Sequence, residues 1–470
     1  MNRLALLPVA LLAGCMLAKP PAHDTIVHDA LPATTKIPTT WTSAATTNAV
    51  AGDWLKTFHD PALDAIVAEA ITNNLDLRQA AAKVEIARQD IALATAQLLP
   101  HLNGQVDFSR TRDSGVSKNY DANTEYGILS WELDVWGKLR SQRAAAKAGY
   151  QAAALDYAWA RQSLAATTAK SWFLASETRQ LVALAGQAVT VYSNALALTK
   201  LKSSAGQVAE LDVAEASAKL NEAQSELRQT QILDAMVRRA LEVILGRYPA
   251  AELAANAAFV PVPPPVTAGV PTALLRERPD ILAAEQSVLE TFRLRETAKL
   301  SLLPTIALSF EGGHFSDNAL TLLGLNPYIL RGMAGAAIPV YDGGALVARI
   351  RIAGAQQQQA VARYGSVVLN AFREVETALT DEGLLAQRID YSSAALQDRT
   401  ESVRIITEQY QAGACDMLPV LQLQAAQLAS AAELIKLHRA QLTNRIQLHL
   451  ALGGSFDAIV PKSNGQYAEH

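Results

Sequence analysis

The sequence has very little cysteine and none of the short motifs that mark an enzyme active site. Its 470 residues include two cysteines, Cys15 and Cys415. No glycine-rich phosphate loop, HExxH zinc motif, GxSxG nucleophile motif or CxxC pair occurs, and the eight histidines are scattered along the chain. General acid–base chemistry needs two carboxylates held together in a pocket, which no spacing here indicates. We therefore expect no enzyme, no metal site and no cofactor.

The sequence also lacks a strong excess of either charge and, beyond its first residues, any long hydrophobic run. The formal net charge is -4, and the charged residues, 18% of the total, intersperse both signs. No nucleic-acid partner is expected from this pattern. No run of about 20 consecutive apolar residues follows the N-terminal segment, which argues against a transmembrane helix. Half of the residues are nevertheless hydrophobic, so the chain must bury a large surface in another way.

The first residues have the pattern of a bacterial lipoprotein signal peptide. Arg3 supplies a positive start, and an apolar stretch leads to the small residues Leu12-Ala13-Gly14-Cys15. We expect residues 1–14 to be removed and Cys15 to carry covalent lipid, such as palmitate. The alternative is an ordinary secretory signal with an incidental cysteine.

The residues after Cys15 bear on the destination of the protein. Met16 stands where an aspartate, by similarity to lipoprotein sorting in enteric bacteria, would favour retention in the inner membrane. Its absence favours the outer membrane. Residues 15–52 are rich in Pro, Thr and Ala without a sustained period, which predicts an extended, wandering tether.

Two pairs of alternating segments predict β-strands, at about 101–112 with 126–135 and at about 305–315 with 329–341. Strands of this length cross a bilayer when tilted, but four strands cannot close a barrel, and open edges are not tolerated in lipid. We therefore expect a transmembrane β-barrel formed by four strands from each of three protomers. The alternative is a soluble four-stranded sheet under helices.

Long stretches without proline predict helices of unusual length, from 137 to about 203 and from 343 to 412. Gly206 and Gly413 interrupt them, and glycine readily takes the left-handed conformation that ends a helix. A heptad-like rhythm follows each glycine, which favours coiled-coil packing. The sequence thus predicts two helical hairpins with their tips near these glycines.

The chain repeats itself once, since Leu98-Leu99-Pro100 recurs as Leu302-Leu303-Pro304 in the same sequence context. We expect a mostly α fold with a small β part, in which a long α-helical coiled-coil barrel and the β-barrel arise from a tandem duplication. The expected divisions are a first repeat (53–248, with its β-hairpin at about 101–136), a Pro-rich linker (249–273), a second repeat (274–453, with its β-hairpin at about 305–341) and a polar tail (454–470).

A motif between the halves, running from Gly269 to Ile281 and containing Arg278-Pro279-Asp280, resembles the inter-repeat signature of TolC-like outer-membrane efflux proteins, in their NodT-type lipoprotein branch. Asn74-Leu75-Asp76-Leu77 is similar to its weaker first-half copy. The resemblance implies a homotrimer in outer-membrane lipid, with a helical tunnel across the periplasm.

The resemblance also implies a function. Such a channel is a passive exit duct that exports small molecules such as drugs, docked through a periplasmic adaptor onto an inner-membrane pump of RND or MFS type. Two alternatives remain open at this stage. One is an outer-membrane channel for type I protein secretion, and the other is a periplasmic coiled-coil structural lipoprotein without a pore.

By the same resemblance, the closed periplasmic entrance lies at the hairpin tips. Tyr410 and Asp212 occupy the positions of a tyrosine and an aspartate that latch the tips together. The alternative is that both residues only pack or cap helices. Cys415 stands where the family latch has an arginine, so one ionic bond of that latch is missing.

The resemblance places further residues at the aperture. Leu418 fits an apolar residue that narrows it, whereas Gln422 and Pro419 replace the aspartates of a familiar anionic ring. Asp416 is a candidate substitute for that ring, but its position favours a simpler role as the cap of the returning helix. Pro419 is tolerated because it falls in the first helical turn.

Overall fold

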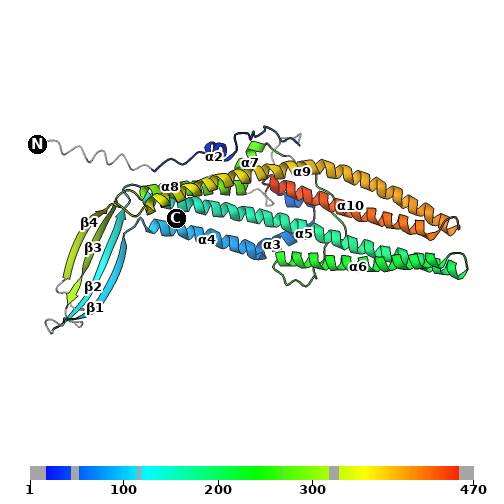
Figure 1. Ribbon diagram of the computed structural model, residues 1–470, viewed down its shortest axis with the longest axis horizontal. Coiled ribbons are helices and arrows are strands. Elements are labelled where there is room, and N and C mark those ends of the chain that lie inside the picture. The colour runs from blue at the N-terminus through cyan, green and yellow to red at the C-terminus, as the bar shows by residue number, and fades with distance from the viewer. Residues whose placement is uncertain (1–16, 44–51, 114–117, 267, 317–327, 455–470) are drawn as a thin grey trace. The chain divides into compact units, whose positions relative to one another are not determined.

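The computed structural model describes residues 17–43, 52–113, 118–266, 268–316 and 328–454 (Figure 1). Its elements, in chain order, are α2 (His23–Ala30), the 3-10 helix η2 (Trp54–Phe58), α3 (Pro61–Asn73), α4 (Leu75–Ala96), β1 (His101–Asp113), β2 (Lys118–Leu133), α5 (Lys138–Ser204), α6 (Glu210–Ile244), α7 (Pro271–Glu277), α8 (Pro279–Leu300), β3 (Thr305–Ser316), β4 (Tyr328–Ala337), α9 (Ala345–Gln411) and α10 (Met417–Ala451).

The elements fall into two compact units. The first unit holds the four strands, α2, and most of α4 and α8, and the second holds η2, α3, α6, α7 and α10. Helices α5 and α9 begin in the first unit and continue into the second.

The two halves of the chain contain helices of equal length in the same order. Helices α4 and α8 have 22 residues each, α5 and α9 have 67 each, and α6 and α10 have 35 each. A helix as long as α5 extends about 100 Å at ~1.5 Å per residue. In the described parts of the chain, α5 is also the one helix that is long and apolar enough to cross a membrane, judged by length and composition only.

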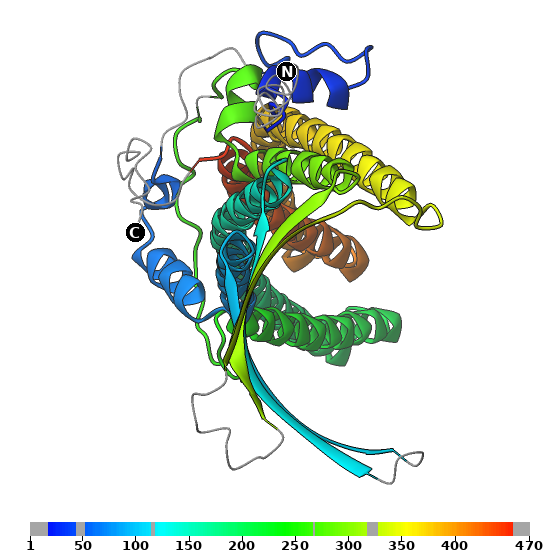
Figure 2. The same cartoon turned by 90° about the vertical axis from the view of Figure 1, so that its left-hand side faces the viewer.

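The strands form one antiparallel sheet in the order β1-β2-β3-β4, and Figure 2 shows that it is curved. The central pair, β2 with β3, joins the two halves of the chain, with Leu129 opposite Phe310. Strand β2 begins earlier than the sequence predicted, at Lys118, because its first residues are polar and show no alternation. Strand β4 ends earlier than predicted, at Ala337, just before Pro339, which has no N–H to donate to a ladder.

The two faces of the sheet differ in polarity. The strand register places on one face a set of large apolar side chains, all of them exposed in the single chain, namely Leu102, Val106, Phe108, Leu129, Trp131, Leu308, Phe310 and Leu330. The opposite face carries polar and charged residues, among them Gln105, Asp107, Glu311 and Arg331. An apolar face of this size exposed to water is unfavourable, which points to an apolar environment around this part of the chain.

The core of the second unit gathers aromatic residues from short and long helices. Trp54 and Phe58 of η2 pack with Trp172 and Phe173 of α5 and with aliphatic residues of α3, α6 and α10. The Trp172 indole donates to Asp60 Oδ2 at 3.0 Å, and the same carboxylate caps α3 through Oδ1. The indole and the helix cap therefore share one buried carboxylate.

Residues 17–43 are not the wandering tether that the sequence predicted, whereas residues 15, 16 and 44–51 of that predicted tether lie outside the described residues. Residues 17–43 include α2, in which Ile26 is buried and His23 Nδ1 lies 2.7 Å from Glu285 Oε2. A Cβ added at Gly365 would lie 2.3 Å from the carbonyl oxygen of Ala30, so only glycine allows this close approach. The prediction missed α2 because eight residues give too little periodicity to read.

The same segment is also held within the second unit. Trp41 is buried, donates through Nε1 to the carbonyl of Ala268 at 2.8 Å, and lies edge-on to Phe372. The Glu376 carboxylate accepts the backbone N–H groups of Thr42 and Ser43 at 2.9 and 3.2 Å. Cys15 and the tail from 455 lie outside the described residues, so their predicted roles stay predictions.

Candidate functional site at the helix-hairpin tips

The two hairpin tips have the same backbone geometry. Gly206 follows α5 with φ +67° and Gly413 follows α9 with φ +78°. In each tip the residue after the glycine donates back to the last helical turn, Gln207 N to Lys202 O and Ala414 N to Gln409 O, both at 2.9 Å. This is a Schellman cap, which a residue with a Cβ would strain.

Four helices meet in one apolar cluster beside the tips. Its buried members come from α5, α6, α9 and α10 and are Tyr192, Ala195, Leu196, Ala216, Ala223, Tyr410, Met417, Val420 and Leu421. Alanines let the helices approach closely, and the aromatic rings fill the remaining space. The cluster ties the first hairpin to the second within one chain.

Tyr410 lies inside this cluster and is only 2% exposed. Its hydroxyl is buried and has no hydrogen-bond partner among the described residues. Asp212, the residue paired with it by resemblance, instead accepts the backbone N–H of Ala209 through Oδ2 at 3.3 Å, at the start of its own helix α6. Within a single chain, the structure therefore does not join these two side chains by a hydrogen bond.

Lys202 makes the contact to Tyr410 that the sequence analysis missed. Its Nζ lies 4.0 Å from the centroid of the Tyr410 ring and donates to the Tyr410 carbonyl oxygen at 2.5 Å. The ammonium thus combines a cation–π contact with a charge-assisted hydrogen bond. It also lies in the last turn of α5, where a positive charge favours the helix dipole. A basic residue in the last turn of a predicted helix was the only signal in the sequence that pointed to Lys202.

The remaining tip residues occupy the start of α10. Asp416 stands at the N-cap position, but its side chain makes no capping hydrogen bond, so the cap role that we favoured lacks its expected contact. Leu418 and Gln422 are exposed. The half-buried thiol of Cys415 lies 3.8 Å from the carbonyl oxygen of Ile406. Of these residues, Cys415 packs against the apolar cluster, whereas Asp416, Leu418 and Gln422 point to solvent in the single chain.

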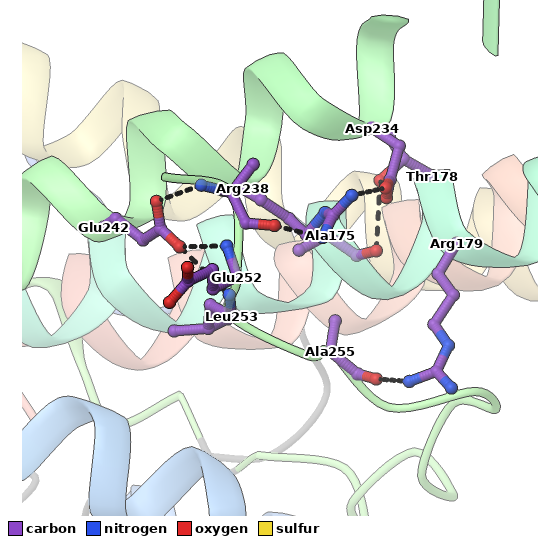
Figure 3. Close-up of polar contacts among 10 residues, drawn as sticks. Ala175, Thr178, Arg179, Asp234, Arg238, Glu242, Glu252, Leu253 and Ala255 are labelled. Carbon is purple, nitrogen blue, oxygen red and sulfur yellow. Dashed lines mark hydrogen bonds and ion pairs between the residues drawn. The ribbon is translucent and has the colours of Figure 1, made fainter. Parts of the chain in front are cut away.

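The beginning of the Pro-rich linker is held by buried polar contacts (Figure 3). The Glu242 carboxylate accepts the backbone N–H groups of Ala251, Glu252 and Leu253 at 2.7, 2.7 and 3.0 Å. Burial alone raises the pKa of Glu242, but these three hydrogen bonds together with Arg238 outweigh it and lower the pKa. The carboxylate therefore stays ionised and fixes the path of the linker.

Two buried arginines hold the middle of the linker and the motif that follows it. Arg445 donates to the carbonyl oxygens of Pro263 and Pro264 and to the Glu382 carboxylate. Arg278, in the motif between the halves, donates to Glu374 at 2.6 Å and stacks over Trp159 at 4.6 Å. A guanidinium suits both places because its planar fork serves several acceptors at once.

Within the described residues, no group of three or more His, Cys, Asp or Glu side chains is arranged to hold a metal ion. The tips instead combine helix caps, an apolar cluster and one charged contact. Such a site can join or separate two helical hairpins, and nothing in it is arranged for bond-breaking chemistry.

Comparison with known proteins identifies the family. The model for outer membrane efflux proteins matches residues 66–247 and 270–454. The pyoverdine export outer membrane protein OpmQ of Pseudomonas putida is 29% identical over 483 residues, covering 98% of this chain and 99% of that protein. The solvent efflux pump outer membrane protein SrpC of Pseudomonas putida is 28% identical and covers 85% and 86%.

A solved structure shares the fold. The Campylobacter jejuni CmeC outer membrane channel superposes with a TM-score of 0.85 at 21% sequence identity, over 94% of this chain and 95% of that one. The chain therefore belongs to the outer membrane efflux protein family, as an outer-membrane channel of an efflux pump and not as an enzyme.

Proposed function

We propose that three copies of this chain form a passive exit duct, with their sheets closed into one β-barrel in the outer membrane. The observation that carries this proposal is the open sheet. Among the described residues β1 and β4 each pair on one side only, and the apolar face between them is exposed. Unpaired strand edges are not stable in lipid, so the edges of β4 and β1 must pair between copies.

The duct is gated at the hairpin tips. Helices α5, α6, α9 and α10 of each copy reach the periplasmic entrance, and the tip cluster with Lys202 and Tyr410 holds the two hairpins of one copy together. Opening requires the hairpins to move apart, a shift in population that a bound partner drives by preferring the separated tips. A periplasmic adaptor, itself bound to an inner-membrane pump of RND or MFS type, is that partner.

The cargo is a small molecule rather than a secreted protein. The relatives OpmQ and SrpC are named for pyoverdine export and solvent efflux, which supports this class. The duct itself needs no cofactor, because the pump supplies the energy.

The mature N-terminus is a lipid-modified Cys15, which adds a membrane anchor to the barrel. Mass spectrometry of the purified protein tests this. The expected N-terminal peptide starts at Cys15 and carries acyl chains, and Cys15→Ser loses them; an unmodified mature cysteine would refute the anchor.

Reconstitution into planar bilayers tests the duct. We expect a heat-modifiable trimer on gels and discrete conductance steps from that trimer. Shortening of the edge strand by deletion within β4 should abolish both, while the helical content measured by circular dichroism is kept. A correctly folded oligomer without conductance would refute the proposal and favour a periplasmic scaffold.

A further inference from the structure

The second unit contains a polar groove that the tip site and the membrane sheet leave unexplained. It has a volume of about 590 Å³ and lies between α5, α9 and α10. The residues that carry the argument are Lys170 and Ser171 of α5, Arg388 of α9, and Arg439, Thr443 and Gln447 of α10.

Helices α5 and α10 turn a different face to this groove than to the core. On α10 the groove side carries Thr443 and Gln447, whereas Leu442 and Ile446 are buried in the aromatic core. On α5 the groove side carries Lys170, whereas Ala169, Trp172 and Phe173 are buried in that core. Arg445 lies on the core side of α10 and binds the linker. The groove is therefore on the side away from the linker.

In an open duct, the linker and the short helices that cover one side of the helical layer must lie outside, since they would otherwise fill the passage. The opposite side then faces the passage. This step rests on the proposed duct, and it places the groove where exported solutes pass.

Three basic side chains, Lys170, Arg388 and Arg439, and one acidic side chain, Asp381, line the groove. Arg388 pairs with Glu433 at 3.1 Å and Arg439 pairs with Glu177 at 2.5 Å, so these two guanidinium groups are held in place and neutralised. Within the described residues, the Lys170 ammonium donates to the neutral amide oxygen of Gln447 and has no carboxylate within ion-pair distance. Burial lowers the pKa of Lys170, and the more distant Glu374 opposes this only in part.

A half-buried ammonium without a carboxylate at contact distance is unfavourable, and an anion that enters the groove removes this cost. The hydroxyl group of Ser171 adds a hydrogen-bond donor beside it, whereas the Thr443 hydroxyl already donates to the carbonyl oxygen of Ala440 at 3.0 Å. A carboxylate or phosphate group uses such donors well, because charge-assisted hydrogen bonds are the strong ones.

We propose that this groove is a lumenal binding station for the carboxylate or phosphate group of a passing solute, with the Lys170 ammonium as its binding group. Binding there is weak, because the groove is wide and open to water. It raises the local concentration of anionic solutes in the duct without closing it.

Citrate block of single-channel current tests the station. Citrate added to the wild-type trimer should interrupt the current briefly, whereas neutral glycerol at the same concentration should not. Lys170→Gln should raise the half-blocking citrate concentration by roughly tenfold, which is the loss expected for one hydrogen bond to a charged group. Lys170→Arg should restore most of the block. Lys436→Gln, an exposed lysine of α10 outside the groove, is the matched control and should change nothing.

The results distinguish a failure of the proposed duct from a failure of the proposed station. No conductance from the wild type refutes the proposed duct itself. Conductance without citrate block, or equal block in wild type and Lys170→Gln, refutes the station alone. A Lys170→Gln trimer that dissociates at lower temperature but is blocked like the wild type would assign the lysine to a contact between copies, and would also refute the station. If Lys170→Gln fails to assemble, Lys170→Met takes its place in the same comparison, and a wild-type current that citrate leaves unblocked refutes the station in either case.

Discussion

The ammonium of Lys202 covers the ring of Tyr410 at 4.0 Å and binds the carbonyl oxygen of the same residue. Lys202 lies in the last turn of α5 and Tyr410 in the last turn of α9, so this pair joins the two hairpins of one chain near their tips. A single side chain thereby links elements that are far apart in the sequence.

Lys202→Met should loosen the tips. Methionine keeps the apolar stem but loses both the cation–π contact and the hydrogen bond, together about 1–2 kcal/mol at this partly exposed place. A loss of that size shifts the equilibrium towards separated tips by roughly 5- to 30-fold. Bilayer recordings should therefore show more frequent openings, and Lys202→Arg should show fewer than Lys202→Met. Equal opening in all three proteins would remove the lysine from the gate.

Tyr410→Phe should leave conductance unchanged, because the hydroxyl that it deletes has no partner among the described residues. The ring, which carries the contact with Lys202, remains. Asp212→Ala should instead destabilise the first turn of α6 by about 0.5–1 kcal/mol, as for a lost helix cap. Hydrogen exchange of residues 209–213 measures this effect. If Tyr410→Phe opened the channel, the hydroxyl would have a partner in the assembled trimer, and the latch implied by the family resemblance would hold.

Arg445→Leu should destabilise the second unit by about 2–4 kcal/mol, since it removes the donor to two linker carbonyls and leaves the Glu382 carboxylate with a 3.4 Å hydrogen bond from Asn444 Nδ2. Arg388→Leu, which removes an exposed ion pair with Glu433, should cost no more than about 1 kcal/mol. Thermal dissociation of the purified trimer compares the two. Similar losses in both variants would contradict the distinction between them.

His449 should make the protein less stable in acid. Burial, and secondarily the charge of Arg445, lower the pKa of His449 to about 4 in the folded chain, from 6.5 for an ordinary histidine. The unfolded chain therefore takes up a proton between these values and the folded chain does not. The stability that this neutral histidine contributes is complete above about pH 6.5 and declines towards pH 4, by roughly 3 kcal/mol in all.

Urea unfolding at several pH values from 4 to 7 measures this decline. The neutral ring stacks on Trp54 with centroids 5.7 Å apart, so His449→Phe keeps a ring in that place and removes the titration. The variant should show a flatter dependence on pH than the wild type. A parallel dependence in the two proteins would rule out His449 as the source.

Local patterns in the sequence predicted the elements well and the contacts between them poorly. The proline-free stretches predicted the long helices, and Gly206 and Gly413 marked their ends, because backbone conformation depends on neighbouring residues. The apolar alternation around Leu102 and Phe108 predicted β1 for the same reason. The polar start of β2 was missed, since residues that pair at the far end of a hairpin need no apolar face.

At the tip site, too, the contacts between helices were predicted less well than the helices themselves. Tyr410 and Asp212 were paired by family position, but whether two side chains meet depends on the rotation of each helix about its axis, which no spacing within one helix records. Lys202 was missed because its partner is a carbonyl and a ring on another helix. The docking of residues 17–43 was missed because it depends on one glycine, Gly365, and one buried indole, Trp41.

The pairing of β2 with β3 sets the order of events during biogenesis. The whole first helical hairpin is synthesised between these strands, so β1 and β2 emerge long before their partner β3 exists. Such non-local pairing is slow, and an apolar hairpin with an open edge is prone to aggregate while it waits. The first strand pair therefore keeps an open, apolar edge until residues 305–316 are available to pair with it.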